Sequence, residues 1–263
     1  MPSPGKSSHH SQQWVNSVWY GSHKLSCLLL PLSGVFAVSA RVRQWKQNNS
    51  RINFSVPVIV VGNITVGGTG KTPMVTALVR ELQKQGYNPG VASRGYGGRV
   101  IQTTLVESSH SADFTGDEPL MIFNSTQAVV AVGKDRLDVI QQLINKHQCD
   151  VIVCDDGMQD YRFEHDIEII MVDGDRGFGN HRLLPAGPLR ESINRLQKAD
   201  FVVATSKAVP AVSGDCMKMQ LSDCVQLVHP QTTRALEEFK GCTVHAVAGI
   251  GNPDRFFNSL ISS

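Results

Sequence analysis

The sequence is poor in the features that mark disulfide-stabilised, zinc-binding, membrane-spanning and disordered proteins. Its six cysteines form no CxxC pair, so neither a zinc cluster nor a disulfide framework is indicated, and a reducing compartment fits best. No clean apolar run reaches the roughly 20 residues that a membrane-spanning helix needs. Hydrophobic residues make up 41% and charged residues 18% of the 263 residues, which excludes a disordered or collagen-like chain. This length fits one α/β domain with appendages.

Acidic residues are absent from the first 80 positions, which hold eight Lys and Arg. The remaining chain carries 17 basic and 23 acidic residues, although the net charge of the whole protein is only +2. An acid-free basic segment is attracted to anionic surfaces, either nucleic acid or phospholipid, while an acidic remainder is repelled by them. The N-terminal segment is therefore the part expected to meet an anionic partner.

Two different segments precede the first predicted strand. Residues 1–13 are small and polar and are expected to form a disordered tail. Residues 14–50 repeat apolar side chains at three- and four-residue intervals, which predicts an amphipathic helix. A proline and a glycine interrupt its apolar stripe, so a helix lying in a membrane surface is one interpretation and an ordinary core helix is the other. The helix ends in basic residues around a tryptophan: Arg41, Arg43, Trp45 and Lys46.

A glycine-rich segment that ends in Gly-Lys-Thr follows a short β-branched run at 56–61 and leads into a helical apolar pattern. Strand, glycine loop and helix in that order are the context of a P-loop, whose backbone N–H groups bind phosphate oxygens. Lys71 then places its charge on the β- and γ-phosphates, and Thr72 offers its hydroxyl to Mg²⁺. The motif is a variant, because a threonine replaces its first glycine. The predicted nucleotide-binding residues are Thr65, Val66, Gly67, Gly68, Thr69, Gly70, Lys71 and Thr72.

Carboxylates follow two other buried runs. Asp155 and Asp156 come directly after one of them, which is typical of the Walker B position that binds Mg²⁺. An Asp-Asp-Gly turn without a metal is the alternative interpretation. Glu118 is a further candidate metal ligand. Asp173 ends the run at 167–172 and is either a site residue or the cap of a turn.

Phosphoryl transfer also needs cations that neutralise phosphate oxygens and a carboxylate that deprotonates the attacking hydroxyl. Asp117 is the candidate base, and Lys71 is the second candidate catalytic residue. Arg94, Arg136 and Arg190 are candidate phosphate-binding residues, since each follows a predicted strand or lies in a glycine- and proline-rich loop. Each arginine also has a plain interpretation as a surface or ion-pair residue.

Several segments together resemble the tetraacyldisaccharide 4′-kinase family, from about Trp19 to the end of the chain. They are LLLPLSGVF, VPVIVVGNITVGGTGKTP, SRGYGG, GDEPLMI, DDGMQD, DRGFGNHRLLPAGPLRE and AVAGIGNPDRFF. The resemblance implies a kinase that uses ATP to phosphorylate the 4′-hydroxyl of a tetraacyl disaccharide 1-phosphate, a lipid A precursor. It also implies that residues 65–72 hold ATP, that Asp117 acts in catalysis, and that Asp155 and Asp156 hold or orient Mg²⁺. The family shares the threonine that begins the loop.

The resemblance further implies that the N-terminal helix contacts the anionic membrane containing the lipid disaccharide. The protein is therefore expected on the cytoplasmic face of the inner membrane, as a peripheral, monotopic protein. Neither nucleic acid nor an obligate protein partner is expected.

This sequence departs from the family pattern in two places. Met158, Asp160 and His165 stand where the family usually has Phe, His and Arg, which changes packing and charge near the predicted metal carboxylates. Members of the family also continue beyond the position of Ser263 through a segment with an Asp-His motif, so residues 51–263 are expected to form a C-terminally incomplete kinase domain.

Alternating strand and helix signals predict a three-layer P-loop NTPase fold, of the α/β class, with a mainly parallel sheet. Residues 206–240 are a candidate second lobe. The predicted strands lie near 56–61, 89–93, 128–132, 150–154, 167–172, 201–205 and 243–248. The predicted helices lie near 71–85, 135–147, 189–198 and 252–261.

Two other functions compete with the kinase. A P-loop GTPase or metallochaperone-like switch usually carries an [NT]-K-x-D motif for guanine after a late strand, and the segment 205–209 (TSKAV) lacks its aspartate. A catalytically impaired, membrane-bound ATP binder is the second alternative, and the missing Asp-His segment favours it.

Overall fold

The structure is a computed structural model that describes residues 14–21, 25–49, 51–209, 214–221, 223–229, 231–250 and 253–261. The tail predicted for residues 1–13 lies outside these residues. Within them, no helix combines the length and the hydropathy needed to cross a membrane.

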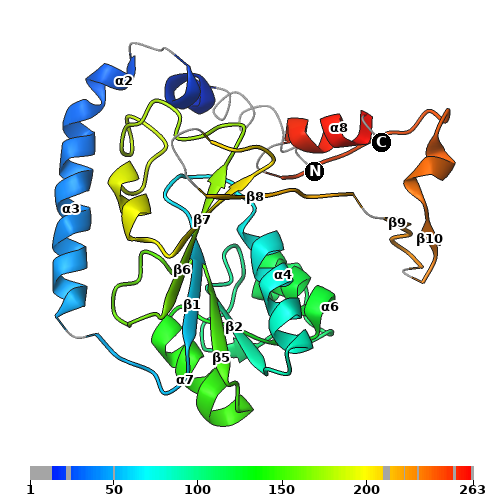
Figure 1. The fold of residues 1–263 in the computed structure, drawn as a ribbon, viewed down its shortest axis with the longest axis horizontal. Helices are drawn as coiled ribbons and strands as arrows, with labels where there is room; N and C mark the ends of the chain where they lie inside the picture. Colours follow the sequence, from blue (N-terminus) through cyan, green and yellow to red (C-terminus); the bar gives the residue numbers. More distant parts are fainter. Residues whose placement is uncertain are drawn as a thin grey trace.

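The core of the protein is an eight-stranded sheet in the order β3-β4-β2-β5-β1-β6-β7-β8 (Figure 1). Neighbouring strands are parallel except β3, which is antiparallel to β4. The central strands β1, β2 and β5 are buried along their whole length, as continuous apolar runs indicate. The predicted, mainly parallel sheet is confirmed. Its strands are β1 (Val58–Gly62), β2 (Pro89–Ser93), β3 (Thr104–Leu105), β4 (Val129–Val132), β5 (Val151–Asp155), β6 (Ile167–Asp173), β7 (Phe201–Thr205) and β8 (Asp215–Met217).

Helices cover both faces of the sheet, so the predicted three layers are confirmed (Figure 1). On one face pack α4 (Lys71–Lys84) and α6 (Asp117–Thr126), and on the other packs α7 (Arg136–His147). Each face has its own buried apolar cluster. One contains Val75 and Val79 of α4 with Ile122 of α6, and the other contains Val139, Ile140 and Leu143 of α7.

Several short elements escape sequence prediction. Strands of two or three residues give no periodic pattern, and the short helix α5 (Ala112–Thr115) is a single turn. Helix α6 begins with Asp-Glu-Pro, and the proline, which reads as a helix breaker, is tolerated there because it lies in the first turn. Residues 206–240 do not stay together: β8 joins the central sheet, whereas β9 (Cys224–Val225) and β10 (Thr233–Arg234) form a separate two-stranded sheet (Figure 1).

Two predictions near the end of the chain need correction. The strand predicted at 243–248 is wrong: this segment pairs with no strand in the structure, and Val247 is 90% exposed. The helix predicted at 189–198 is a shorter 3-10 helix, η1 (Ile193–Lys198), because the Ser192 side chain accepts a hydrogen bond from the Asn194 N–H and begins the helix there. A second 3-10 helix, η2 (Leu236–Phe239), was not predicted, and the C-terminal helix is found as α8 (Pro253–Ile261).

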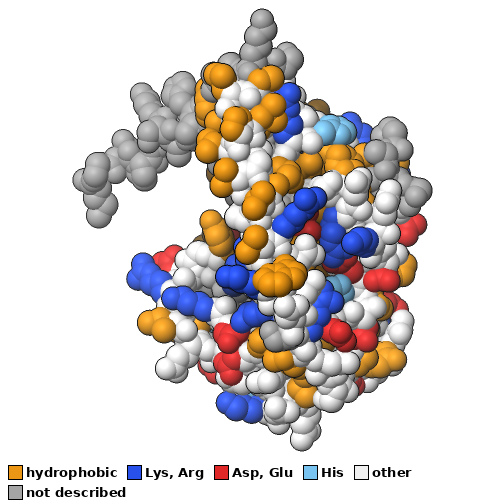
Figure 2. Space-filling model, turned by 90° about the vertical axis from the view of Figure 1, so that its left-hand side faces the viewer, with side chains coloured by type: hydrophobic (Ala, Val, Ile, Leu, Met, Phe, Trp, Pro, Cys, Tyr) orange, Lys and Arg blue, Asp and Glu red, His pale blue; other side chains and the backbone are white. Residues whose placement is uncertain are grey.

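The N-terminal segment is helical at 14–20, in α2 (Leu25–Leu28) and in α3 (Leu30–Asn48). Pro31 does not interrupt α3, because it lies in the first turn, where its missing N–H costs nothing. Among the described residues of α3 only Ser33 is buried, so the core-helix interpretation is wrong. Figure 2 shows hydrophobic side chains gathered along this helix and basic ones toward its lower end. The exposed apolar residues of α2 and α3 include Leu28, Leu30, Leu32, Val35, Val38, Val42 and Trp45.

Few but specific polar contacts hold α3 against the domain. The Ser33 hydroxyl donates to the carbonyl of Leu183 (2.9 Å) and accepts from the N–H of Ala186 (3.1 Å). Near the other end of the helix, the Gln47 side chain accepts from the N–H of Tyr161 (3.2 Å). One serine therefore joins α3 to two backbone groups of the loop at 183–186.

We expect Ser33→Ala to lower the free energy of unfolding by about 1–3 kcal/mol, because it leaves the buried N–H of Ala186 without its partner. Ser39→Ala is the matched control, since the Ser39 hydroxyl bonds only to Phe36 within the same helix. Urea denaturation of both variants measures the difference. Equal stability of the two variants would contradict the anchoring role of Ser33.

Candidate functional site

The glycine-rich loop leaves the buried end of β1 and enters α4 at Lys71. Its backbone requires glycine at two points, because Gly67 has φ +119° and Gly70 has φ +85°. A Cβ at Gly70 would also lie 2.7 Å from Thr205 Cγ2 of β7, so a larger residue would displace the neighbouring strand end. The predicted strand, loop and helix of a P-loop are therefore present, and the helix N-terminus lies at the loop.

Lys71 is held at the centre of the site. Its Nζ atom lies 3.7 Å from Oδ1 of Asp156 and 3.4 Å from Oδ1 of Asn63. The amide of Asn63 also donates to the carbonyl of Thr65 (2.7 Å), so this side chain fixes the loop and the lysine together. Asn63 is completely buried, and sequence analysis missed it; its only signal is a polar residue directly after a buried strand.

Asp155 and Asp156 occupy the end of β5 next to the loop, as predicted. Burial and the nearby Glu118 raise the pKa of Asp155 to about 7, although Lys71 opposes the shift. For Asp156, burial acts in the same upward direction, but Lys71 and Arg190 outweigh it and lower its pKa. The two neighbouring carboxyls thus differ: Lys71 and Arg190 keep the Asp156 carboxylate charged, whereas burial favours the neutral form of Asp155.

Arg136 is bonded to the turn that carries the two aspartates. Its guanidinium is buried and donates to the backbone carbonyls of Asp155 (2.8 Å) and Asp156 (3.1 Å). In the structure Arg136 therefore holds the turn that carries the two aspartates, and its contact with nucleotide stays a prediction. Such a buried cation is stabilised by the carbonyl dipoles and by the neighbouring carboxyls.

Arg190 reaches Asp156 at the end of β5. Its Nη1 atom lies 3.2 Å from Oδ2 of Asp156, and its backbone N–H donates to the carbonyl of Ile64 (2.7 Å). The same loop is joined to the P-loop a second time, since the N–H of Val66 donates to the carbonyl of Pro188 (2.9 Å). The segment 182–190 is therefore one wall of the nucleotide loop.

Gln159 and Glu191 extend this wall. The Gln159 amide donates to the carbonyl of Asn63 (3.2 Å) and to Oε1 of Glu191 (3.0 Å). No sequence motif points to either residue, although both lie within the segments that carry the family resemblance. Gln159 therefore links Asn63, just before the P-loop, to Glu191, the residue that follows Arg190.

Helix α6 brings two carboxylates to the opposite side of the site. Asp117 is exposed at the first position of the helix, and its side chain accepts from the N–H of Glu118 (3.0 Å). Burial of the carboxyl raises the pKa of Glu118, while Lys71 and a hydrogen bond with Thr72 oppose this shift. Glu118 is thus within reach of both P-loop residues that the sequence predicts to contact phosphate and metal.

Within the residues that the structure describes, three others that the sequence singles out make no hydrogen bond or ion pair with Lys71 or Asp156. Arg94 is exposed after β2, and its side chain makes no hydrogen bond or ion pair within the described part of the chain. Asp173 accepts from the N–H groups of Asp175 (2.9 Å) and Arg176 (3.2 Å), so it caps a turn, as one of its two interpretations expects. Asp160, at a position where the family pattern differs, pairs with Arg162 at 2.7 Å.

The site suits a metal that phosphate oxygens help to hold. No group of three or more His, Cys, Asp or Glu able to bind a metal occurs in the described residues. A P-loop Mg²⁺ needs only one or two protein oxygens besides phosphate and water. Thr72, Asp155, Asp156 and Glu118 offer such oxygens, and the buried Oδ1 of Asp155 has no hydrogen-bond partner among the described residues. These donors fit Mg²⁺ bound with a nucleotide.

We expect Gly95→Ala to disturb the start of α6, because a Cβ at Gly95 would lie 2.7 Å from the carbonyl of Thr115. Gly97→Ala is the control: Gly97 also has a positive φ (+81°), but its Cβ would meet nothing within 4 Å. Both variants strain the backbone by about 1 kcal/mol. Only Gly95→Ala should also displace Asp117 and Glu118 and so lower the rate of phosphoryl transfer. Thermal melting and the initial rate of phosphoryl transfer are measured for both variants. An equal loss of stability and of initial rate in both variants would contradict this packing role of Gly95.

Comparison with known proteins agrees with this geometry. The family model LpxK, tetraacyldisaccharide-1-P 4′-kinase, matches residues 25–263. The tetraacyldisaccharide 4′-kinase of Shewanella denitrificans is 46% identical over 253 residues, which cover 95% of this chain and 76% of that protein. The tetraacyldisaccharide 4′-kinase of Methylobacillus flagellatus is 43% identical over 256 residues, which cover 94% of this chain and 75% of that protein. The crystal structure of "apo" form LpxK from Aquifex aeolicus in complex with ATP has a TM-score of 0.75 and 28% identity, over 90% of this chain and 78% of that one. The chain belongs to the tetraacyldisaccharide-1-P 4′-kinase family.

Proposed function

We propose that this protein transfers the γ-phosphoryl group of ATP to the 4′-hydroxyl of a tetraacyl disaccharide 1-phosphate, a step of lipid A biosynthesis. The observation that carries the proposal is the convergence of Lys71 and Thr72 of the P-loop with Asp155, Asp156 and Glu118. Family membership supports the reaction, and the ATP bound to the related Aquifex protein supports the nucleotide.

In this proposal the P-loop amides and Lys71 bind the phosphates of ATP, and Arg190 neutralises charge on them. Thr72 together with Asp155, Asp156 and Glu118 would hold Mg²⁺, which supplies further charge neutralisation when it is bound. The Asp156 carboxylate already orients both cations: its Oδ2 lies 3.2 Å from Nη1 of Arg190, and its Oδ1 lies 3.7 Å from Nζ of Lys71. Such preorganised cations need no rearrangement of the protein when negative charge develops.

Asp117 is the proposed base for the sugar hydroxyl. It is exposed to solvent and lies next to Glu118, which approaches the P-loop. An exposed carboxylate at the rim is accessible to an acceptor that arrives from outside, whereas the buried Asp155 is not. We therefore assign proton removal to Asp117 and metal binding to Asp155, Asp156 and Glu118, the three carboxyls that interact with Lys71.

We expect Lys71→Ala to abolish turnover without unfolding the protein, because Asp156 keeps its contact with Arg190. Lys84→Ala, at the exposed end of the same helix, controls for the loss of one cation from α4. The assay is phosphoryl transfer from ATP to the tetraacyl disaccharide 1-phosphate in detergent, with GTP compared. Normal turnover in Lys71→Ala would remove the P-loop from the mechanism, and a wild type that binds ATP but never turns over would favour the impaired ATP binder.

Asp117→Asn keeps the shape of the side chain and removes its ability to accept a proton. We expect kcat to fall on the order of 10²–10⁴-fold while the affinity for ATP changes little. Asp113→Asn, an exposed aspartate in α5, is the control. If Asp117→Asn instead loses nucleotide binding and keeps a normal rate per bound ATP, Asp117 is a metal ligand.

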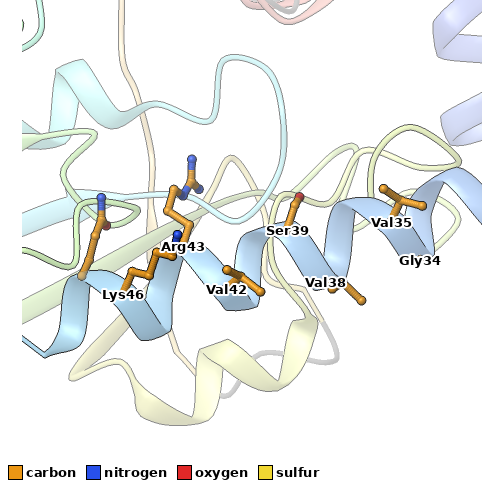
Figure 3. A pocket seen from close by; sticks show the side chains of 8 residues that line it. Gly34, Val35, Val38, Ser39, Val42, Arg43 and Lys46 are labelled. Carbon is orange, nitrogen blue, oxygen red and sulfur yellow. The ribbon is translucent and has the colours of Figure 1, made fainter.

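We also propose that the N-terminal helical segment binds an anionic membrane surface without spanning the membrane, at the cytoplasmic face of the inner membrane. A pocket of about 800 Å³ runs along α3 and is lined by Val35, Val38, Val42, Arg43 and Lys46, among others. Figure 3 shows Val35 at one end of this row and the two basic residues at the other. An apolar face that ends in basic side chains fits acyl chains and anionic head groups.

Replacing Arg41, Arg43 and Lys46 together by Gln should weaken binding to anionic vesicles by about two decades, since each cation contributes roughly 1 kcal/mol at such a surface. Lys84, Lys146 and Lys218, replaced in the same way, control for net charge. High salt should mimic the first variant by screening. Protein that stays in membranes through carbonate and high-salt extraction would be inserted more deeply than proposed. Protein that never sediments with anionic vesicles would contradict membrane binding.

A further inference from the structure

An arginine that the proposed mechanism does not use lies against the P-loop. A Cβ built at Gly67 would be 3.8 Å from Nη1 of Arg176, so the guanidinium approaches one of the two loop glycines with positive φ. Arg176 follows β6 in a tight turn, where the N–H of Gly177 donates to the carbonyl of Asp173 (2.7 Å). The turn carries the arginine across the carboxyl end of the sheet, where phosphate is expected to bind.

The charge of Arg176 is not neutralised by an ion pair within the described residues. The neighbouring cations differ: Arg190 pairs with Asp156 at 3.2 Å, and Lys207 pairs with Asp175 at 3.1 Å. The guanidinium of Arg176 instead lies over the ring of Tyr20, with its Cζ atom 5.6 Å from the ring centroid. An aromatic face orients a guanidinium while leaving its N–H donors available to an anion.

The residues that precede Tyr20 are held to the same loop. The indole N–H of Trp19 donates to the carbonyl of Pro185 (3.0 Å), and the carbonyl of Trp19 accepts from the N–H of Asn180 (2.8 Å). The Asn180 amide also donates to the carbonyl of Val18 (3.2 Å), whose side chain is buried. The helical residues 14–20 are therefore docked on the loop that carries Arg176, and this docking places the ring of Tyr20 beside the guanidinium.

We infer that Arg176 contacts the phosphates of the nucleotide in the P-loop and that Tyr20 is the positioning residue that holds its guanidinium there. The inference rests on the proposed function, because it assumes that the loop binds ATP. The 1-phosphate of the disaccharide offers the same chemistry. Proximity to Gly67, a residue of the nucleotide loop itself, assigns Arg176 to the nucleotide phosphates. The N-terminal segment is then part of the ATP site as well as of the membrane-facing surface.

The test is equilibrium binding of Mg-ATP to the full chain without lipid, followed by the KM values for ATP and for the disaccharide. Arg176→Gln should weaken ATP binding about 10- to 100-fold, the range for one lost charge-assisted contact. Arg176→Lys should restore only part of it, because lysine keeps the charge and loses the planar donors. Lys207→Gln, which removes a nearby exposed cation, should change ATP binding less than threefold. Unchanged ATP binding in Arg176→Gln, or a shift confined to the KM for the disaccharide, would overturn the assignment.

The positioning role of Tyr20 is tested by replacing its side chain with an aromatic or an aliphatic one. Tyr20→Phe keeps the aromatic face and should bind ATP within about twofold of wild type, whereas Tyr20→Leu should weaken binding about fivefold. In the Arg176→Gln background Tyr20→Leu should add nothing, because the tyrosine acts through the arginine. Equal effects of Tyr20→Leu in both backgrounds would overturn the positioning role. A wild type that binds no ATP would refute the proposed function instead, so the two failures are distinguishable.

Discussion

The carboxylate of Asp156 is the contact on which the geometry of the site depends. It lies between Lys71 and Arg190, at 3.7 Å and 3.2 Å, and so joins the P-loop helix, the end of β5 and the loop that follows β6. The three segments are far apart in the sequence, and each carries a charge that would be costly to bury alone. Asp156 adopts φ +54°, a strained backbone for a residue other than glycine. The two hydrogen bonds from Arg136 to the carbonyls of this turn hold it in that conformation.

The sequence predicts the sheet well and the orientation of side chains less well. Continuous β-branched runs such as 56–61 identify buried parallel strands, because only a strand covered on both faces needs apolar side chains on both. The run at 243–248 (TVHAVA) mixes β-branched residues with alanine and histidine. A strand also needs a partner, and no sequence pattern shows whether one is near. Arg136 illustrates the corresponding limit at the site. Its position after β4 places it at the correct edge of the sheet, but the direction of its guanidinium depends on carbonyls twenty residues away.

Residues that sequence analysis missed share a different property: they act on backbone or on other side chains. Asn63 holds a carbonyl of the P-loop, and Gln159 joins that segment to Glu191. No motif of phosphoryl transfer demands an amide at either place, so chemistry alone does not point to them. Arg176 was missed because its relation to Gly67 exists only after the turn behind β6 has folded back over the sheet.

The loop at 176–191 connects the two surfaces that a lipid kinase needs. On one side it accepts the N-terminal segment, through Ser33 to Leu183 and through Trp19 to Pro185. On the other side Pro188 and Arg190 bond directly to the P-loop. A disaccharide whose acyl chains stay in a membrane must present its hydroxyl at a fixed height above that membrane. In the proposed function, α3 lies on the membrane, and a single loop that is hydrogen-bonded to both α3 and the P-loop segment then sets this height without a separate domain to position the acceptor.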